Sequence, residues 1–499
     1  MHLNKKKTIR HSYSCSSRPD GQLARALGFP AWYTLTFLGF LGLLNIVGMD
    51  SAMYIIFHAT VKSPLYSSFS PSPYCPERKD YNSSHFPKKT EFEWDSKSQR
   101  IILISYYYGH CLSPLPAGYI SDMYGAKWLF GCSVLVNALL SILIPTSARS
   151  SSAFLAAIRA LQGIAGGAAI ASINTLIVKW MPIMERNSHY AIIYNGIPLG
   201  IVFSFAVDYF IAENDYLGGW TSLFYIEAAI TVIWFLFWSI LIFEAPEDHK
   251  FLSETEVEKI RLAQGKDVKN LTKLSGVPWR KIITSPAVWA LAAANCGVRW
   301  SYETLFLELP IYMATVLNYP FMDNRLRSSM PFISGAVIGF TFGYLADNVR
   351  SKGRYSITTI RKTFNCFAFC VPGIGFIIFP FTGCDTNTLV FLSVLTVVFI
   401  EAKNAGSGIA HIDMCPELSA TLYGIVRAIG GLFGSLAPLF AIFVTTYMDV
   451  KYHWKIVFFT TGLILFASAL IFHFLGTAEE QDWLRRQKSS DERAEESDI

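Results

Sequence analysis

Ionisable side chains inside long apolar runs are the residues of this sequence most able to do chemistry. Arg159 lies within one such run, Arg299 and Glu303 lie one helical turn apart in another, and Arg427 lies in a third. A charge at bilayer depth costs at least ~2.5–3.5 kcal/mol, so it normally faces a cavity or a partner. A guanidinium offers a planar fork of donors that suits a carboxylate or a phosphate. We therefore expect these arginines to bind an anion.

Each of these charges also has a plainer interpretation, as an internal ion pair or as a side chain that reaches the membrane surface. The binding interpretation is favoured for Arg159, both fit Arg427 equally, and a structural pair with Glu303 fits Arg299 slightly better. The tyrosine run 106–108 could supply hydroxyl donors, although an aromatic run is more often packing. The candidate substrate-binding residues are Arg159, Arg427, Arg299 and Tyr107.

A short glycine–aspartate motif lies between two apolar runs, where it predicts a tight turn between helices. Gly118 permits close helix packing, Asp122 faces the end of a neighbouring helix, and Gly125 ends the turn. A shorter copy, residues 343–347, occupies the corresponding place in the second half, as expected of a duplicated fold. The residues that we expect to act in coupling or gating are Asp122, Gly118, Gly125, Glu303, Asp413 and His411.

The composition favours a bilayer as the solvent and excludes several functions. Hydrophobic residues make up 52% of the 499 residues and charged residues only 16%, whereas soluble domains carry about 25% charged residues. The net charge of +5 lies mostly in loops and gives no case for nucleic acid. The nine cysteines include no Cys-x-x-Cys pair, so we expect neither a metal site nor a disulfide framework. No nucleotide loop or nucleophile motif appears, so we expect no enzyme and no cofactor.

Apolar runs of spanning length predict an all-α membrane protein with twelve transmembrane helices. Several runs are interrupted by proline or glycine, which is tolerated where neighbouring helices or a cavity satisfy the freed backbone groups. The runs lie near 33–57, 99–120, 128–147, 153–180, 188–211, 221–243, 286–313, 330–347, 362–382, 387–410, 420–446 and 455–476.

A charged stretch divides the twelve runs six and six, and the short loops indicate orientation. Lysine and arginine gather in alternate short loops, which places both chain ends in the cytoplasm. The 58–98 loop then lies on the opposite side, where Asn82 of an Asn-Ser-Ser sequon could be glycosylated. The predicted organisation is a cytoplasmic tail 1–32, a six-helix bundle 33–243, a cytoplasmic loop 244–285, a six-helix bundle 286–476 and a cytoplasmic tail 477–499.

In its membrane setting the glycine–aspartate motif resembles the signature loop of the major facilitator superfamily. Further stretches resemble one branch, the anion–cation symporters that include sialin, the vesicular glutamate transporters and the type I sodium–phosphate cotransporters. The resemblance implies two six-helix bundles around a central cavity and alternating-access transport of a small organic anion or phosphate. It runs from about residue 30 to about 480, and its best stretches include 159–163, 179–186, 278–285, 309–312 and 411–416.

The sequence departs from this branch at positions to which the resemblance assigns transport chemistry. Branch members usually carry an arginine in helix 1, where the stretch 47–51 has no cation. They usually carry a glutamate implicated in proton coupling seven residues after the helix 4 arginine, where this chain has Gly166. The helix 7 arginine of the glutamate transporters corresponds to Val298, next to Arg299. Only Arg159 carries over cleanly, so the choice of Na⁺ or H⁺ as the coupling cation stays open.

We therefore expect a secondary active transporter of a small anion in the plasma membrane or in a vesicle or lysosome membrane. Its partners would be the anion, a coupling cation and the lipid bilayer. Gly166 also favours an uncoupled facilitator or exchanger on the same fold. A non-transporting receptor or scaffold that keeps the fold is the remaining alternative.

Overall fold

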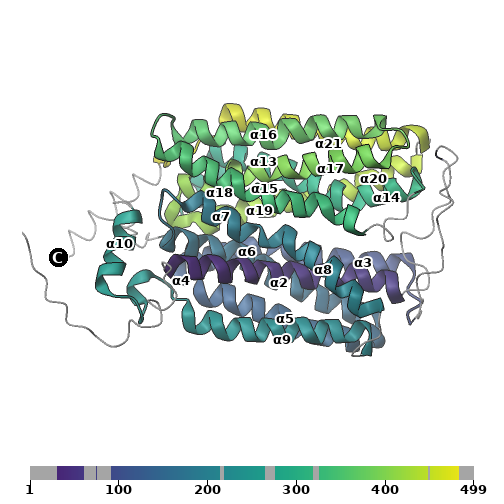
Figure 1. The fold of residues 1–499 in the computed structure, drawn as a ribbon, viewed down its shortest axis with the longest axis horizontal. Coiled ribbons are helices and arrows are strands. Elements are labelled where there is room, and N and C mark those ends of the chain that lie inside the picture. The colour runs from purple at the N-terminus through teal and green to yellow at the C-terminus, as the bar shows by residue number, and fades with distance from the viewer. Residues whose placement is uncertain are drawn as a thin grey trace, which may run out of the picture.

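Long, roughly parallel helices form two adjacent bundles (Figure 1). The computed structural model describes residues 31–60, 75, 91–213, 218–264, 276–318, 325–447 and 450–482. The first bundle, purple to teal in Figure 1, is built by the helices of the first half of the chain. These are α2 (Ala31–Thr60), α3 (Ser96–Leu112), α4 (Pro114–Tyr124), α5 (Lys127–Ser150), α6 (Ser152–Trp180), α7 (Arg186–Tyr194), α8 (Gly196–Glu213) and α9 (Trp220–Leu241).

The second bundle, green to yellow, is built by the second half, and shorter helices connect the two. The connecting elements are η3 (Pro246–Asp248), α10 (Glu254–Gln264) and α12 (Trp279–Thr284). We call the end of the molecule that carries α10 the α10 end. The second bundle contains α13 (Pro286–Glu303), η4 (Thr304–Glu308), α14 (Leu309–Thr315), α15 (Arg325–Ser351), α16 (Ile357–Ile378), η6 (Phe379–Phe381), α17 (Thr386–Ile400), η7 (Glu401–Asn404), α18 (Ser407–Met414), η8 (Pro416–Leu418), α19 (Ser419–Gly434), α20 (Leu436–Tyr447) and α21 (Val450–Leu475).

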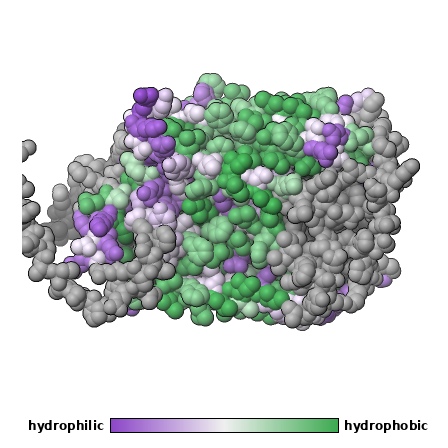
Figure 2. All heavy atoms as spheres, viewed as in Figure 1, coloured by the Kyte–Doolittle hydropathy of each residue, from purple (hydrophilic) through white to green (hydrophobic). Residues whose placement is uncertain are grey.

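Apolar side chains cover the middle of the face shown in Figure 2, and hydrophilic side chains gather toward the α10 end. In the described part of the chain, nine helical segments are long and apolar enough to cross a membrane by length and composition. The other three of the twelve transmembrane helices are interrupted. They are formed by α3 with α4, by α7 with α8, and by α13 with α14.

Each interruption has a local cause in the chain. Pro114 begins α4 directly after α3, and a turn at Asn195 separates α7 from α8. Between α13 and α14 the backbone forms one π-helical turn, η4. Such turns are rare and often accompany functional sites. All three broken helices contribute residues to the central cavity described below.

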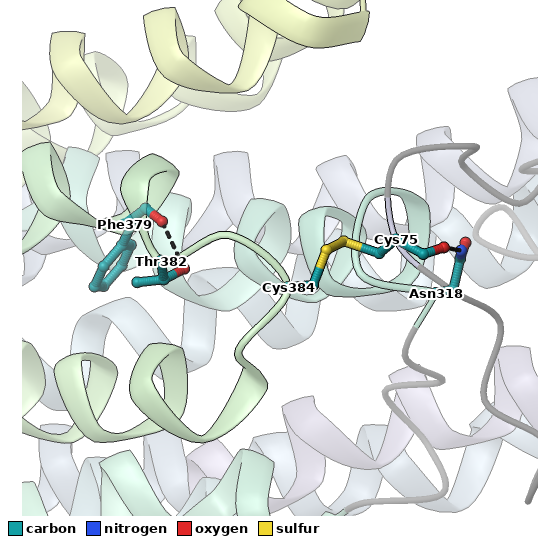
Figure 3. Close-up of a disulfide and its surroundings, with 5 residues drawn as sticks. All are labelled: Cys75, Asn318, Phe379, Thr382 and Cys384. Carbon is teal, nitrogen blue, oxygen red and sulfur yellow. Dashed lines mark hydrogen bonds between the residues drawn. A yellow bond between two sulfur atoms is a disulfide. The ribbon is translucent and has the colours of Figure 1, made fainter.

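A disulfide joins Cys75, in the loop after α2, to Cys384, in the loop between α16 and α17 (Figure 3). The Cα atoms of the two cysteines are 5.7 Å apart, and Asn318 donates a hydrogen bond of 2.7 Å to the Cys75 carbonyl oxygen. We expected no disulfide framework from the sequence, and this one bond corrects that expectation. The two cysteines are separated by 309 residues in sequence, so their spacing carries no local signal. We call the end of the molecule that carries this bond the disulfide end.

Several expectations fall on residues that the structure does not describe. Asn82 lies outside the described residues, as do most of the 58–98 loop and most of both predicted tails. Their predicted roles therefore remain predictions.

Candidate functional site

A cavity of about 220 Å³ lies between the two bundles. Its walls come from α2, α3, α6, α7 and α8 of the first bundle and from α13, α15, α18, α19 and the π and 3₁₀ turns of the second. The lining is mostly apolar and aromatic. The ionised side chains that line it are Asp50, Arg299, Glu303, Glu401, Lys403 and Arg427.

Arg159 lies behind the cavity wall, where it is paired with a carboxylate. Its guanidinium donates a hydrogen bond to Asp50 of α2 and a second, of 3.1 Å, to the side-chain oxygen of Gln162. The Tyr106 ring covers it, with 4.5 Å from the guanidinium carbon to the ring centre. Only 1% of Arg159 is exposed. The charge that the sequence favoured most for anion binding is thus neutralised by Asp50 in this conformation.

Arg299 and Glu303 form the ion pair that their spacing predicts. The Arg299 guanidinium lies 2.8 Å from a Glu303 carboxylate oxygen and 3.5 Å from the Tyr107 hydroxyl. Tyr107 in turn donates a hydrogen bond of 3.0 Å to the Gly431 carbonyl oxygen of α19. Tyr107 therefore links the first bundle to the second at the cavity wall, and its hydroxyl proton is already used.

A third ion pair, between Glu401 and Lys403, lies in the 3₁₀ turn η7. Lys403 donates to the Glu401 carboxylate at 2.9 Å, and the Asn404 side chain donates at 2.8 Å. The Tyr302 hydroxyl of α13 also donates to Glu401. Glu401 is 1% exposed, so this cluster stabilises the break in the helix beside the cavity.

Arg427 is the cavity cation that has no carboxylate partner among the described residues. It lines the cavity from α19 and is partly buried. Among the described residues, Arg159, Arg299 and Lys403 are each paired with a carboxylate, whereas no ion pair or hydrogen bond joins Arg427 to another described residue. The cavity region therefore carries one uncompensated positive charge, and it is located on Arg427.

Gly166 marks the position at which the resemblance placed a glutamate. A Cβ atom built there would lie 3.1 Å from the Tyr106 hydroxyl, 3.3 Å from Ile46 and 3.4 Å from the His110 ring. The Tyr106 and His110 side chains therefore occupy the space that a longer side chain at residue 166 would enter. His110 was not among the residues singled out from the sequence, because a lone histidine in an apolar helix carries no distinctive signal.

Asp122 caps a helix of the opposite bundle at the α10 end. Its carboxylate accepts hydrogen bonds from the Thr421 amide at 2.7 Å, the Thr421 hydroxyl at 2.8 Å and the Ala420 amide at 3.3 Å. These groups lie in the first turn of α19, where the helix dipole favours negative charge. Gly118, one turn away on α4, allows the contact, because a Cβ there would lie 2.1 Å from the Ala420 carbonyl oxygen.

Asp347 repeats this arrangement in the reverse direction. From α15 of the second bundle it accepts hydrogen bonds from Ser188, at 2.8 Å from the amide and 2.6 Å from the hydroxyl. The Asn187 amide donates at 3.3 Å, so Asp347 caps the first turn of α7. A Cβ at Gly343 would lie 2.8 Å from the Asn187 carbonyl oxygen. The two glycine–aspartate motifs therefore join the bundles by two related contacts.

Gly125, another predicted gating residue, ends helix α4. Gly125 has a φ of +117° and a backbone that favours glycine. The adjacent Glu244 accepts from the Lys127 amide at 2.9 Å and pairs with Lys179. Burial raises the pKa of Glu244, but the Lys179 ammonium and the backbone amides lower it more, so its pKa falls below the usual value.

Asp413 and His411 are not brought together in one site. Asp413 pairs with Arg361 at 2.7 Å, and an Arg350 nitrogen lies 3.6 Å away. Asp413 is not part of the cavity lining. His411 does line the cavity, and its Nε2 lies 3.1 Å from the Asn174 side-chain oxygen of the first bundle.

The fold and the paired motifs define a membrane transporter of two related bundles, and the comparisons with known proteins agree. The family model of the Major Facilitator Superfamily matches residues 38–402, so the chain belongs to this superfamily. This membership places it among transporters and not among enzymes. The sequence-based expectations of the fold and the family are confirmed.

Relatives of the chain lie in the branch that the sequence resembles. A Drosophila ananassae protein whose name places it among inorganic phosphate cotransporters is 30% identical over 79% of this chain and 82% of its own length. Human sialin is 28% identical over 91% of this chain and 90% of its own length. Vesicular glutamate transporter 2.2 of Danio rerio is 28% identical over 81% of this chain and 68% of its own length.

The solved structure of the proton:xylose symporter XylE is similar in fold. It aligns with 90% of this chain and 96% of its own, at a TM-score of 0.66 and 13% identity. At this identity the likeness supports the fold and nothing about the substrate.

Proposed function

We propose that this protein is a secondary transporter of a small anion and that Arg427 is the cation that attracts the anion into the cavity. The observation that carries this proposal is the charge balance of the cavity. Three cations are paired with three carboxylates, and Arg427, beside the open space, has no ion-pair partner in the described part of the chain. An unpaired guanidinium in a confined site favours a carboxylate or a phosphate, which it can bind with two parallel hydrogen bonds.

The size of the cavity and the names of the relatives support a small substrate. The cavity volume of about 220 Å³ lies below the ~300–1,000 Å³ of sites for drug-sized ligands. Two of the relatives are named for an anion, phosphate in one case and glutamate in the other. We infer that this chain carries inorganic phosphate or a small organic anion.

Alternating access is supported by the two aspartate contacts at the α10 end. Asp122 and Asp347 each bind the first turn of a helix in the opposite bundle. Both contacts must break if the bundles separate at this end. We infer that the described conformation is closed at the α10 end, and that Asp122, with Gly118 and Gly125, acts as a latch.

We further propose that the α10 end faces the cytoplasm. Hydrophilic side chains gather toward that end in Figure 2, and the short loops that the sequence places on the cytoplasmic side are rich in lysine and arginine, as the positive-inside rule requires. The opposite end carries the disulfide, and disulfides persist in oxidising compartments such as the cell exterior or the lumen of the secretory pathway. Both termini and the 244–285 loop would then be cytoplasmic, with Asn82 on the glycosylated side. The membrane would be the plasma membrane or that of a vesicle or lysosome.

Uptake by purified protein in proteoliposomes tests this proposal. Radiolabelled phosphate and glutamate serve as probes, with and without imposed Na⁺ and pH gradients, and protein-free liposomes serve as the control. Accumulation driven by one gradient is the expected result. Exchange without accumulation would indicate an uncoupled exchanger, and probe binding without any flux would indicate a receptor. Either result would contradict secondary active transport.

A further inference from the structure

His110 is an imidazole in the wall of the cavity, and no described residue forms a hydrogen bond with its ring. It lies on α3, is 8% exposed and faces the cavity. Its ring is stacked on Tyr106, with 5.8 Å between ring centres. No hydrogen bond joins its ring nitrogens to any side chain that the structure describes. A ring that lines a cavity and has no described protein partner can exchange a proton with the contents of that cavity.

The other carboxyl and imidazole groups in the cavity lining are already partnered within the described chain. Asp50 binds Arg159, Glu303 binds Arg299, and Glu401 binds Lys403. His411 is hydrogen-bonded to Asn174. Adding a proton to any of these would break an ion pair or a hydrogen bond. His110 can gain a proton without breaking a contact that the structure describes.

His110 and Arg427 lie on neighbouring helices that pack closely. Gly431, one turn after Arg427 on α19, is in contact with Cys111, because a Cβ at Gly431 would lie 3.0 Å from the Cys111 Cβ. Both His110 and Arg427 line the same cavity. The titratable and charged groups on the elements around His110 are Tyr106 and Tyr107 on α3, Cys111 on α3, Asp50 on α2, Arg159 on α6, Arg299 and Glu303 on α13, and Arg427 on α19.

We propose that His110 takes up the proton that is carried together with the anion, so that the protein is a proton–anion symporter. This inference deepens the proposed transport function and depends on it. With His110 neutral, the cavity holds one uncompensated positive charge. An anion bound at Arg427 would favour the protonated imidazole, because an opposite charge within a few ångströms stabilises the charged form. Histidine is suited to this role because its imidazole can exist as a neutral ring or as a cation and so can take up and release one proton.

The transport step follows from this linkage. A proton from the solution on the disulfide side binds a ring nitrogen of His110, and the anion binds at Arg427. The loaded cavity then opens at the α10 end. When the anion leaves, the positive charge of Arg427 is again uncompensated and the proton leaves His110 for the solution on that side. One proton and one anion move in the same direction, and no covalent bond changes except N–H.

The test compares wild-type protein with His110→Gln in proteoliposomes, with phosphate and glutamate as probes and the membrane potential held at zero. A gradient of one pH unit can drive ~tenfold accumulation of a solute that is carried with one proton. We expect the wild type to approach this ratio. His110→Gln should still exchange internal for external probe at equal pH but should show no accumulation. His453→Gln is the matched control, because His453 is buried on α21 and does not line the cavity.

A second measurement covers the possibility that His110→Gln folds poorly. In weakly buffered detergent solution, the wild type should take up about one proton for each anion bound, and His453→Gln should do the same. Full pH-driven accumulation by His110→Gln, or anion binding by the wild type without proton uptake, would overturn the inference. Wild-type exchange without any response to the pH gradient would overturn it while leaving anion transport intact. Absence of exchange by the wild type would overturn the transport function itself, and this inference with it.

Discussion

Arg159 on α6 donates a hydrogen bond to Asp50 on α2, and this pairing changes what the most distinctive arginine of the sequence does. Arg159 is almost fully buried, whereas a quarter of the Asp50 side chain is exposed to the cavity. Arg159 therefore neutralises a carboxylate that would otherwise repel an anion. Its contribution to anion transport is indirect in this conformation.

Removal of Arg159 alone should strongly reduce uptake, and neutralising Asp50 as well should restore most of it. Breaking a buried pair by deleting one member leaves an uncompensated charge and costs ~3–5 kcal/mol. Arg159→Ala leaves the Asp50 carboxylate facing the cavity, so we expect uptake to fall at least ~tenfold, which corresponds to ~1.4 kcal/mol. The Asp50→Asn/Arg159→Gln double variant should recover most of the uptake. A double variant as inactive as Arg159→Ala would show instead that Arg159 binds the anion directly.

Asp122→Asn should change turnover more than apparent substrate affinity. The asparagine keeps the shape of the side chain but loses the charge that the first turn of α19 stabilises. Asp347→Asn is the matched variant, because Asp347 makes the related contact with α7. Initial rates over a range of probe concentrations separate kcat from KM. A rise in KM at constant kcat for both variants would argue against a latch.

The Cys75–Cys384 disulfide should protect two of the nine cysteines from thiol reagents until the protein is reduced. Cys75→Ser and Cys384→Ser should lower the thermal stability by similar amounts, and the double variant should lower it no further, because each single change already removes the bond. Melting of purified protein and mass spectrometry after maleimide labelling provide the two measurements. Additive effects of the two single variants, or labelling of Cys75 without reductant, would contradict the bond.

The sequence predicted the helices well and the pairing of charges poorly, for a physical reason. Apolar runs report burial in the bilayer directly, so twelve helices followed from composition along the chain. The pair of Arg299 and Glu303 was also foreseen, because the two residues are one helical turn apart. The partner of Arg159 is 109 residues away in sequence, and helix periodicity does not reveal which helices pack together.

Residues without a motif were missed for a related reason. Cys75 and Cys384 lie in separate loops of different bundles, so their bond depends on how the bundles assemble. His110 occupies an ordinary position in an apolar helix. Its proposed role depends on the cavity that it lines together with Arg427, which the sequence does not reveal. The glycine–aspartate motifs were identified, but the structure was needed to locate the helix ends that Asp122 and Asp347 contact.

The most direct test of the central claim is the binding and uptake of phosphate and glutamate by Arg427→Ala and Arg427→Lys. We expect Arg427→Ala to lose uptake and anion-induced thermal stabilisation, while its melting temperature without anion stays near that of the wild type, because Arg427 has no ion-pair partner among the described residues. Arg427→Lys should keep part of both activities, since lysine retains the charge without the planar fork. Uptake by Arg427→Ala at the wild-type rate and affinity would contradict the assignment of the anion site.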